Sequence, residues 1–499
     1  MLRYVGHPFV DVGAATIAAL VGKVDPSTLN EGDLDRVADF IAREYVVDPL
    51  KSFLNVAFPN SGYTNPAFEN RPEKRGEYAD RVLRGYRLST PRTESRCVFT
   101  GQPATAIAFS DKLPPGRGFR QHIPLTMGEG YINFYPWGDA GLPVSGEALL
   151  CIQAFPLGCA KCGGKLLAVH SDNPDVTYDF ASEFLRRNRS ALLIAHAEKS
   201  KKMPEARTSP KTLLIETLVN LEQRRQDERR ERRPCSVTAY YLTNSGQSNP
   251  LDPRNPPLEI YHLPTELTAF LGSIVTPEYK EEWSAIVARA WRLSTQKKNA
   301  SKNGEKGGLA EEDDRPKRNL LYEDLFQLPT GFPSFVRRYL LRLPVRSRAE
   351  DDPRRNYSLR DEAHLVSWSL TQLLLAKVVR MDSQRIEQIR MMGDRLAQYV
   401  AEENDKRFFS SFFAEQNYGN FRNNLIRANV AHVRRGNPPL ITLDPYIEVF
   451  EEGDEVASPD WKLARDLVLI RMVERLHERG WLAKNREAIP EFSGEAMPQ

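Results

Sequence analysis

Two cysteines, Cys159 and Cys162, are separated by two residues and flanked by glycine on both sides. This spacing lets two thiolates approach one metal ion tetrahedrally, and glycine permits the tight turn between them. A structural zinc site needs four ligands. Upstream, Cys97 begins a similar segment, but Thr100 stands where its second cysteine would be. The sequence therefore predicts a metal site of Cys97, Cys159 and Cys162 that is one ligand short.

Four interpretations compete for these cysteines. Zinc is the candidate cofactor if Cys151, His122 or His170 supplies the fourth ligand. The second interpretation, equally favoured, is that the site has lost its zinc and that apolar packing holds its two segments together. A redox pair fits less well, because no thioredoxin-like strand and helix surround the motif. A catalytic cysteine is the weakest interpretation, and in the two favoured ones the segment has a structural role.

The loop Pro59–Phe68 is rich in amide and hydroxyl side chains. Such residues are common turn formers, so a plain connecting loop is one interpretation. Amides also match the hydrogen-bonding edges of bases, and a tyrosine ring can wedge or stack beside them. The residues expected to contribute to base recognition are Asn60, Ser61, Tyr63, Thr64 and Asn65, with Asn244 and Gln247 from a second polar turn.

Basic residues are concentrated in one part of the chain. The formal net charge is only +3, yet Lys and Arg outnumber Asp and Glu between residues 186 and 233. Charged runs are usually solvated helix faces. An arginine surplus also attracts a phosphate backbone, and the candidate phosphate contacts are Arg186, Arg187 and Arg189.

Composition limits the class of protein. A chain of 499 residues with 41% hydrophobic residues is expected to fold into several domains with real cores. Five cysteines without a recognisable signal peptide favour a reducing compartment and free thiols. No apolar run approaches the roughly 18 residues of a membrane span. We therefore expect a cytoplasmic protein with no membrane partner.

The elements that position these residues mix helices and strands without regular βαβ alternation, which predicts an α+β fold. The glycine turn after Cys162 is expected to join two strands as a hairpin. The expected helices are 14–21, 34–45, 179–197 and one beginning at 211, and the expected strands are 148–155, 165–170, 236–242 and 258–264.

The chain beyond residue 319 is expected to be nearly all helical. Apolar spacing over 365–400 predicts one long amphipathic helix. A second helix is expected to be capped by Ser458–Asp460 and to end at Gly480. The polar segment 296–318 has almost nothing apolar to bury and is predicted to be a flexible insertion. These features divide the chain into a mixed nucleic-acid-binding domain, 1–370, with a cysteine-knuckle region at 92–170, and a helical bundle, 371–499.

The sequence contains no phosphate-binding P-loop, no zinc-protease motif and no nucleophile elbow. Its eight histidines are scattered singly, and a lone histidine is more often a packing residue than a catalytic base. The sequence therefore predicts a binding protein and no enzyme.

Five short segments together match one known family. They are Gly6–Gly13, Asn60–Asn65, Cys97–Pro103, Cys159–Gly164 and Tyr240–Asn244. In these segments the chain resembles the CXXC-CXXC family, the large subunits of the CRISPR Cascade effector of subtype I-B and its relatives. Thr100 stands where the Cys-x-x-Cys pattern that names the family has a cysteine. This difference affects the expectation of a zinc site more than the other features that the resemblance implies.

The resemblance implies a non-catalytic subunit of an RNA-guided complex. Its amino-terminal domain would recognise the target-adjacent motif and help to unwind target DNA, and its helical bundle would hold the displaced strand. The implied partners are CRISPR RNA, target DNA, the backbone, RNA-end-binding and small Cascade subunits, and a helicase-nuclease that the subunit helps to recruit. Guide pairing supplies sequence specificity in such complexes, so the protein reads only a few bases.

In relatives the bundle is also made separately, as a small subunit translated from an internal start. Met381, Met391 and Met392 lie where such a start would be, and Met381 retains more of the apolar stripe. Two other classes of function also fit the residues. One is a stand-alone zinc-ribbon protein that binds RNA or DNA, and the other is a cysteine-dependent hydrolase that pairs Cys97 or Cys162 with His122 or His170.

Overall fold

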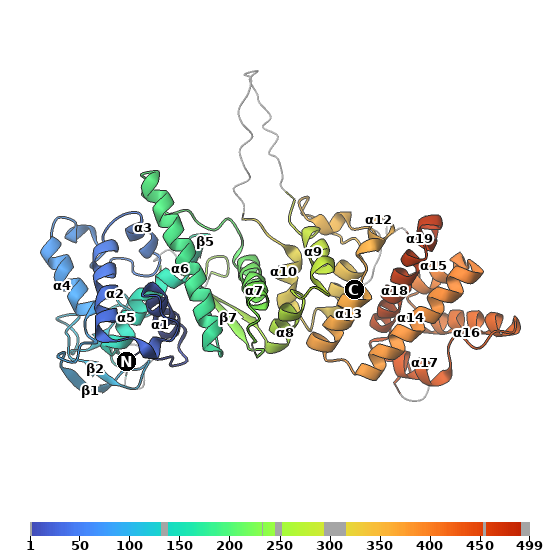
Figure 1. Cartoon of the computed structure of the whole chain (residues 1–499), viewed down its shortest axis with the longest axis horizontal. Helices are drawn as coiled ribbons and strands as arrows, with labels where there is room; N and C mark the ends of the chain where they lie inside the picture. The colour runs from blue at the N-terminus through green and yellow to red at the C-terminus, as the bar shows by residue number, and fades with distance from the viewer. Residues whose placement is uncertain are drawn as a thin grey trace, which may run out of the picture. The chain divides into compact units, whose positions relative to one another are not determined.

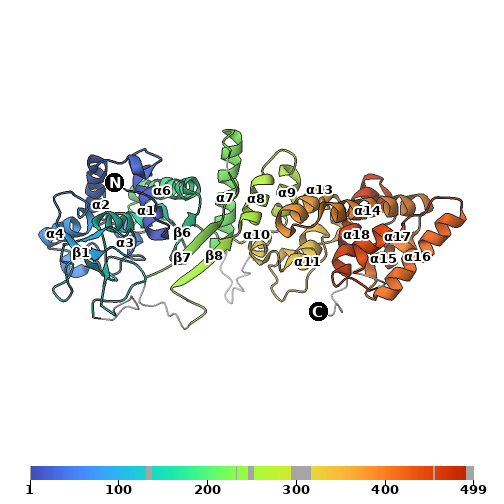
Figure 2. The ribbon, with the colours of Figure 1, turned by 90° about the horizontal axis from the view of Figure 1, so that it is seen from below.

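The computed structural model describes residues 2–130, 138–231, 233–244, 252–293, 316–452 and 456–490 (Figures 1 and 2). Helices and strands are mixed, with 54% helix and a helical carboxy-terminal region, as the sequence predicted. The chain forms two compact units, Met1–Arg225 with Arg230–Thr268, and Gln226–Arg229 with Ala269–Gln499. The structural division therefore falls well before the predicted one at 370/371.

The first unit is built around helix α1 (Pro8–Leu20), which is mostly apolar and almost wholly buried. Proline occupies its first position and the His7 ring accepts the Phe9 N–H at 3.3 Å, so the helix begins earlier than predicted. Helices α5 (Gly146–Ala154) and α6 (Pro174–Ala197) pack against it (Figure 1), as does strand β6 (Lys165–Ser171). The other helices of this unit are α2 (Glu31–Glu44), α3 (Leu50–Leu54), α4 (Pro72–Leu83), α5 (Gly146–Ala154), α6 (Pro174–Ala197) and α7 (Pro210–Asp227).

A four-stranded antiparallel sheet completes the first unit, in the order β5-β6-β7-β8. Its strands are β5 (Ala160–Cys162), β6 (Lys165–Ser171), β7 (Val237–Leu242) and β8 (Leu258–Leu263). Gly163 and Gly164 both have positive φ, which suits the two-residue turn between β5 and β6. Strands β7 and β8 pair with each other along their whole length. Two smaller sheets pair β1 (Arg92–Arg96) with β2 (Pro103–Thr105) and β3 (Arg117–Gly118) with β4 (Leu142–Pro143).

The strand predicted over 148–155 is wrong, because these residues form most of helix α5 and the start of a 3-10 turn, Phe155–Gly158. The Ser145 hydroxyl caps the helix by accepting the Ala148 N–H at 3.2 Å. Nearly every side chain of α5 is buried, so its sequence carries no helical periodicity.

The second unit is helical and centres on α18 (Trp461–Glu478), which packs chiefly against α14 (Ser383–Glu403) (Figure 2). Gly480, with φ +67°, follows the end of α18 as predicted. The remaining helices are α8 (Thr265–Ser273), which contains the boundary between units, α9 (Lys280–Ala288), α10 (Leu320–Asp324), α11 (Phe332–Phe335), α12 (Leu359–Glu362), α13 (Trp368–Leu374), α15 (Lys406–Ala414), α16 (Tyr418–Arg434), α17 (Leu443–Phe450) and α19 (Trp481–Lys484).

The single long helix predicted over 365–400 is divided in two. Helix α13 continues into a π-helical turn, Leu375–Val379, and ends at Arg380, whose φ of +57° is left-handed. Asp382 then caps α14 by accepting the N–H groups of the helix's second and third residues at 2.7 and 3.1 Å. Most of the predicted insertion 296–318 lies outside the described residues. No described helix is long and apolar enough to cross a membrane.

Candidate functional site

The three cysteines predicted to share a metal are all buried, each in its own local setting. Cys97 follows β1 and starts a turn that the Gly101 N–H closes on its carbonyl at 2.9 Å. The Cys159 thiol donates to the Phe155 carbonyl at 3.2 Å. Burial raises the pKa of Cys159 well above its ordinary value and that of Cys162 to about 12. In the metal-free protein both thiols are therefore protonated at neutral pH.

Within the described ranges, no three His, Cys, Asp or Glu side chains gather closely enough to hold a metal ion. The predicted zinc site of Cys97, Cys159 and Cys162 is therefore not formed in this structure, and none of the suggested fourth ligands completes it. Packing joins the segments instead. The Phe99 ring lies 4.7 Å from that of His7, and Gly158 is so close to Thr16 that a Cβ would lie 2.0 Å from its hydroxyl oxygen.

The two histidines proposed as partners of a catalytic cysteine have other contacts. The ring of His170 lies 2.9 Å from a carboxylate oxygen of buried Asp11, which also accepts two backbone N–H groups of the segment before α1. His122 is buried beside Phe119, and burial lowers its pKa to about 3. Among the described residues neither histidine is hydrogen-bonded to a cysteine, so the structure does not form the hydrolase pair.

Most polar side chains of the amide-rich loop are buried or bonded within the loop's own unit. Ser61, Tyr63 and Thr64 are each no more than 5% exposed. The Thr64 hydroxyl donates to the Phe58 carbonyl at 3.1 Å and lies 3.3 Å from that of Ser61. The Tyr63 ring packs edge-on against two further tyrosines. Asn65 accepts the Ala67 N–H at 2.9 Å and so caps a 3-10 turn. These contacts give the four residues a structural role, and their predicted role in base recognition stays a prediction.

Asn60 is the exception in this loop. It is exposed, with a φ of +60°, a left-handed conformation that asparagine tolerates better than most residues. It lines a hollow of about 430 Å³ together with Arg120, Gln121 and Glu129. Sequence analysis did not single out these three neighbours, because no motif or spacing links them to Asn60.

Asn244 has a structural role that the sequence did not indicate. It is 3% exposed, and its amide donates to the carbonyls of Ala57 and Arg120 at 2.9 and 3.2 Å. Its side-chain oxygen accepts the Leu125 N–H at 3.2 Å. The amide therefore joins two loops, and its predicted role in base recognition stays a prediction. Gln247 lies outside the described residues.

The predicted phosphate contacts on α6 differ in their surroundings. Arg186, Arg187 and Arg224 all donate to the buried carboxylate of Glu183, at 2.7 to 2.9 Å. Burial alone would raise the pKa of Glu183, but these hydrogen bonds hold it down at about 2. The Arg186 side chain is still 65% exposed. Arg189 is exposed, and no described residue pairs with its guanidinium.

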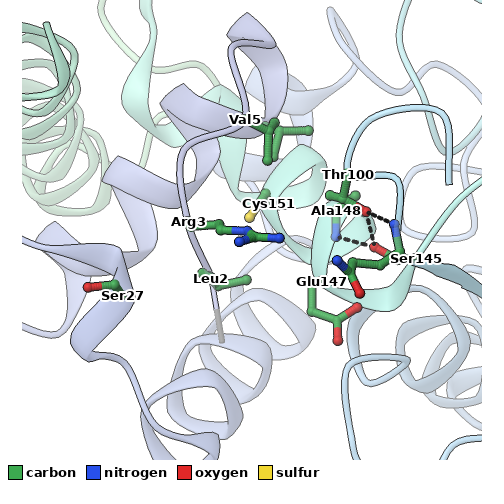
Figure 3. A pocket seen from close by; sticks show the side chains of 11 residues that line it. Leu2, Arg3, Val5, Ser27, Thr100, Ser145, Glu147, Ala148 and Cys151 are labelled. Atoms are coloured by element: carbon green, nitrogen blue, oxygen red, sulfur yellow. Dashed lines mark hydrogen bonds between the residues drawn. The ribbon is translucent and has the colours of Figure 1, made fainter.

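A cavity of about 340 Å³ lies beside the start of α5 (Figure 3). The segment before α1, the turn after β1 and the first turns of α5 enclose it, and Thr100 lines it. The hydroxyls of Thr100 and Ser145 are 3.4 Å apart. Figure 3 shows the Arg3 side chain among the residues that line the cavity. The sequence pointed to Thr100 only as a missing ligand and gave no sign of the cavity.

No protein-family model, curated protein or solved structure shows significant similarity to the chain. The family resemblance therefore rests on the five sequence segments alone.

Proposed function

We propose that the chain is the non-catalytic large subunit of an RNA-guided CRISPR Cascade complex. In this role it recognises the motif beside the DNA target, helps to open the duplex, holds the displaced strand and helps to recruit a helicase-nuclease. Its partners are CRISPR RNA, target DNA and the other Cascade subunits.

The observation that carries this proposal is the convergence of the five segments on one core. His7 contacts Phe99, which links the first segment to the third. The Tyr241 hydroxyl donates to the Cys162 carbonyl at 2.9 Å, which links the fourth to the fifth. Asn244 bonds to the residues that lead into the amide-rich loop. All five segments thus belong to one compact unit, as the proposal requires.

The proposed internal start has independent support. Met381 directly precedes Asp382, the cap of α14, whereas Met391 and Met392 lie inside that helix. Translation from Met381 would yield a bundle whose first helix is complete and capped. We expect mass spectrometry of the assembled complex to detect this fragment, and a fragment starting at Met391 or Met392 would contradict the argument.

The test is co-purification of a tagged chain expressed with its neighbouring operon. We expect CRISPR RNA and several partner proteins to accompany it, with the same chain expressed alone as the control. Nucleic acid without any protein partner would favour the stand-alone binder. Reaction with thiol-directed substrate probes would favour the hydrolase and overturn the proposal.

A further inference from the structure

The cavity beside α5 has the size and the mixed lining of a small-ligand site. Its volume of about 340 Å³ lies in the lower part of the range for such pockets, roughly 300 to 1,000 Å³. Leu2, Val5, Val10 and Ala148 form an apolar wall. The polar lining includes Arg3, Thr100, Gln102 and Ser145.

The charges around this cavity favour an anion. Arg3 has no described hydrogen bond or ion pair among the residues that the structure covers. Glu147 also lines the cavity, but Arg92 holds its carboxylate through two bonds of 3.0 Å, which balances its charge. These three side chains together carry one net positive charge. The nearby Asp11 carboxylate is already held by His170 and by two backbone N–H groups. The first turn of α5 adds the partial positive charge of a helix start.

The rest of the lining narrows the class of anion. A bare phosphate would occupy a small part of the cavity and leave the apolar wall against water. A nucleotide fills both parts, because its phosphate suits a guanidinium and hydroxyls while its sugar and base cover apolar surface. The Gln102 amide can donate and accept in one plane, as recognition of a base edge requires. An arginine plane can also stack on a base.

We propose that this cavity binds one unstacked nucleotide of a single-stranded nucleic acid, with the phosphate at Arg3 and the base against the wall formed by Val5, Val10 and Ala148. This inference rests on the proposed function, which supplies two single strands, the guide RNA and the displaced DNA. Both strands consist of nucleotides and could occupy the cavity, and the experiment distinguishes RNA from DNA.

The experiment measures binding of the full-length protein to fluorescent single-stranded RNA and DNA oligonucleotides of one sequence, at several salt concentrations. Arg3→Gln removes the cation, and Ala148→Met fills the cavity. Arg71→Gln is the matched control, because Arg71 is an exposed arginine of the same unit without a described side-chain partner. We expect both cavity variants to bind about tenfold more weakly, and Arg3→Gln to reduce the salt slope by about 0.7, the value for one phosphate of a single strand. The control should bind as wild type, and the oligonucleotide that shows the loss identifies the strand.

Photocrosslinking of the wild-type protein to oligonucleotides that carry one thiolated base gives a second readout. We expect crosslinks within residues 2–10, 97–102 or 145–151. If Ala148→Met lowers the melting temperature, its weaker binding can result from unfolding. Arg3→Gln and the crosslinks then test nucleotide binding in the cavity. Wild-type affinity in both variants, or crosslinks only at other residues, would contradict nucleotide binding in the cavity. Neither result would contradict the proposed function. A wild-type chain that binds neither strand and purifies without CRISPR RNA would instead overturn the proposed function.

Discussion

The amide-rich loop and the cavity beside α5 are both rich in polar side chains, but they use them differently. In the loop, Ser61, Thr64 and Asn65 bond to each other or to nearby backbone. At the cavity, Arg3 and Gln102 line open space instead. A polar residue in a turn therefore indicates a ligand only when the turn itself does not consume its hydrogen bonds. The predictions that follow test this distinction, beginning with the largest effect.

Replacing Asn244 with alanine should destabilise the first unit most. The change leaves the buried Ala57 carbonyl, the part-buried Arg120 carbonyl and the part-buried Leu125 N–H without their partner. Each unpaired buried group costs about 1–3 kcal/mol, so we expect a loss of about 3 kcal/mol or more in the free energy of unfolding. Urea denaturation measures it. Asn60→Gly is the matched control, since it removes an exposed amide at a left-handed position that glycine accepts. Similar small losses of unfolding free energy in the two variants would contradict the structural role of Asn244.

A smaller loss is expected within the loop. Thr64→Val keeps the shape of the side chain but removes its bond to the Phe58 carbonyl, which should cost about 1–3 kcal/mol. Because Thr64 is buried, the preference for targets with the adjacent motif should not change. A variant of normal stability with altered preference would return Thr64 to the set of base-reading residues.

Asn60→Gly should have the opposite pattern. We expect stability close to wild type and about tenfold weaker discrimination between matched targets with and without the motif, since one good base contact contributes about 1–3 kcal/mol. Binding to motif-free DNA should stay the same. An unchanged ratio of affinities for targets with and without the motif would mean that the motif is recognised elsewhere in the protein.

On α6, Arg189 provides a cleaner test of phosphate binding than its neighbours. Arg189→Glu should weaken DNA binding for all sequences alike and reduce the salt slope by about 0.9 or more, with stability unchanged. Reversing Arg186 or Arg187 should also destabilise the fold, because both donate to Glu183. If Arg189→Glu altered only motif preference, this arginine would be a base reader.

The Glu183 cluster should also leave a signature in the pH dependence of stability. Because its folded pKa is lowered to about 2, the cluster contributes stability above the unfolded value of 4.5, and this is lost as pH falls through the folded pKa. Glu183→Gln should therefore be less stable than wild type at neutral pH, and the two unfolding curves should converge toward pH 2. Glu69→Gln, which alters an exposed ion pair, is the control. A constant difference across the range would contradict this account.

Local patterns predicted local structure well. The β7 and β8 strands and helices α2 and α6 lie close to where alternation and periodicity placed them. Helix α5 was missed because its burial on all sides removes periodicity, and the break at Arg380 was missed because apolar spacing continues on both sides of it. The role of Asn244 could not be predicted, because Ala57 is 187 residues away in the sequence. The cavity likewise depends on segments that only the fold brings together.

The burial of α1 has a consequence for how the protein is made. This helix is synthesised first in its unit, but α5, β6 and α6, which cover it, end as late as residue 197. At about 5–20 residues per second, a ribosome needs roughly ten to thirty seconds to make that stretch. During this time the helix lacks part of the surface that covers it in the folded unit. The nascent chain should therefore depend on chaperones until α6 emerges, and translational pauses before that point should increase aggregation.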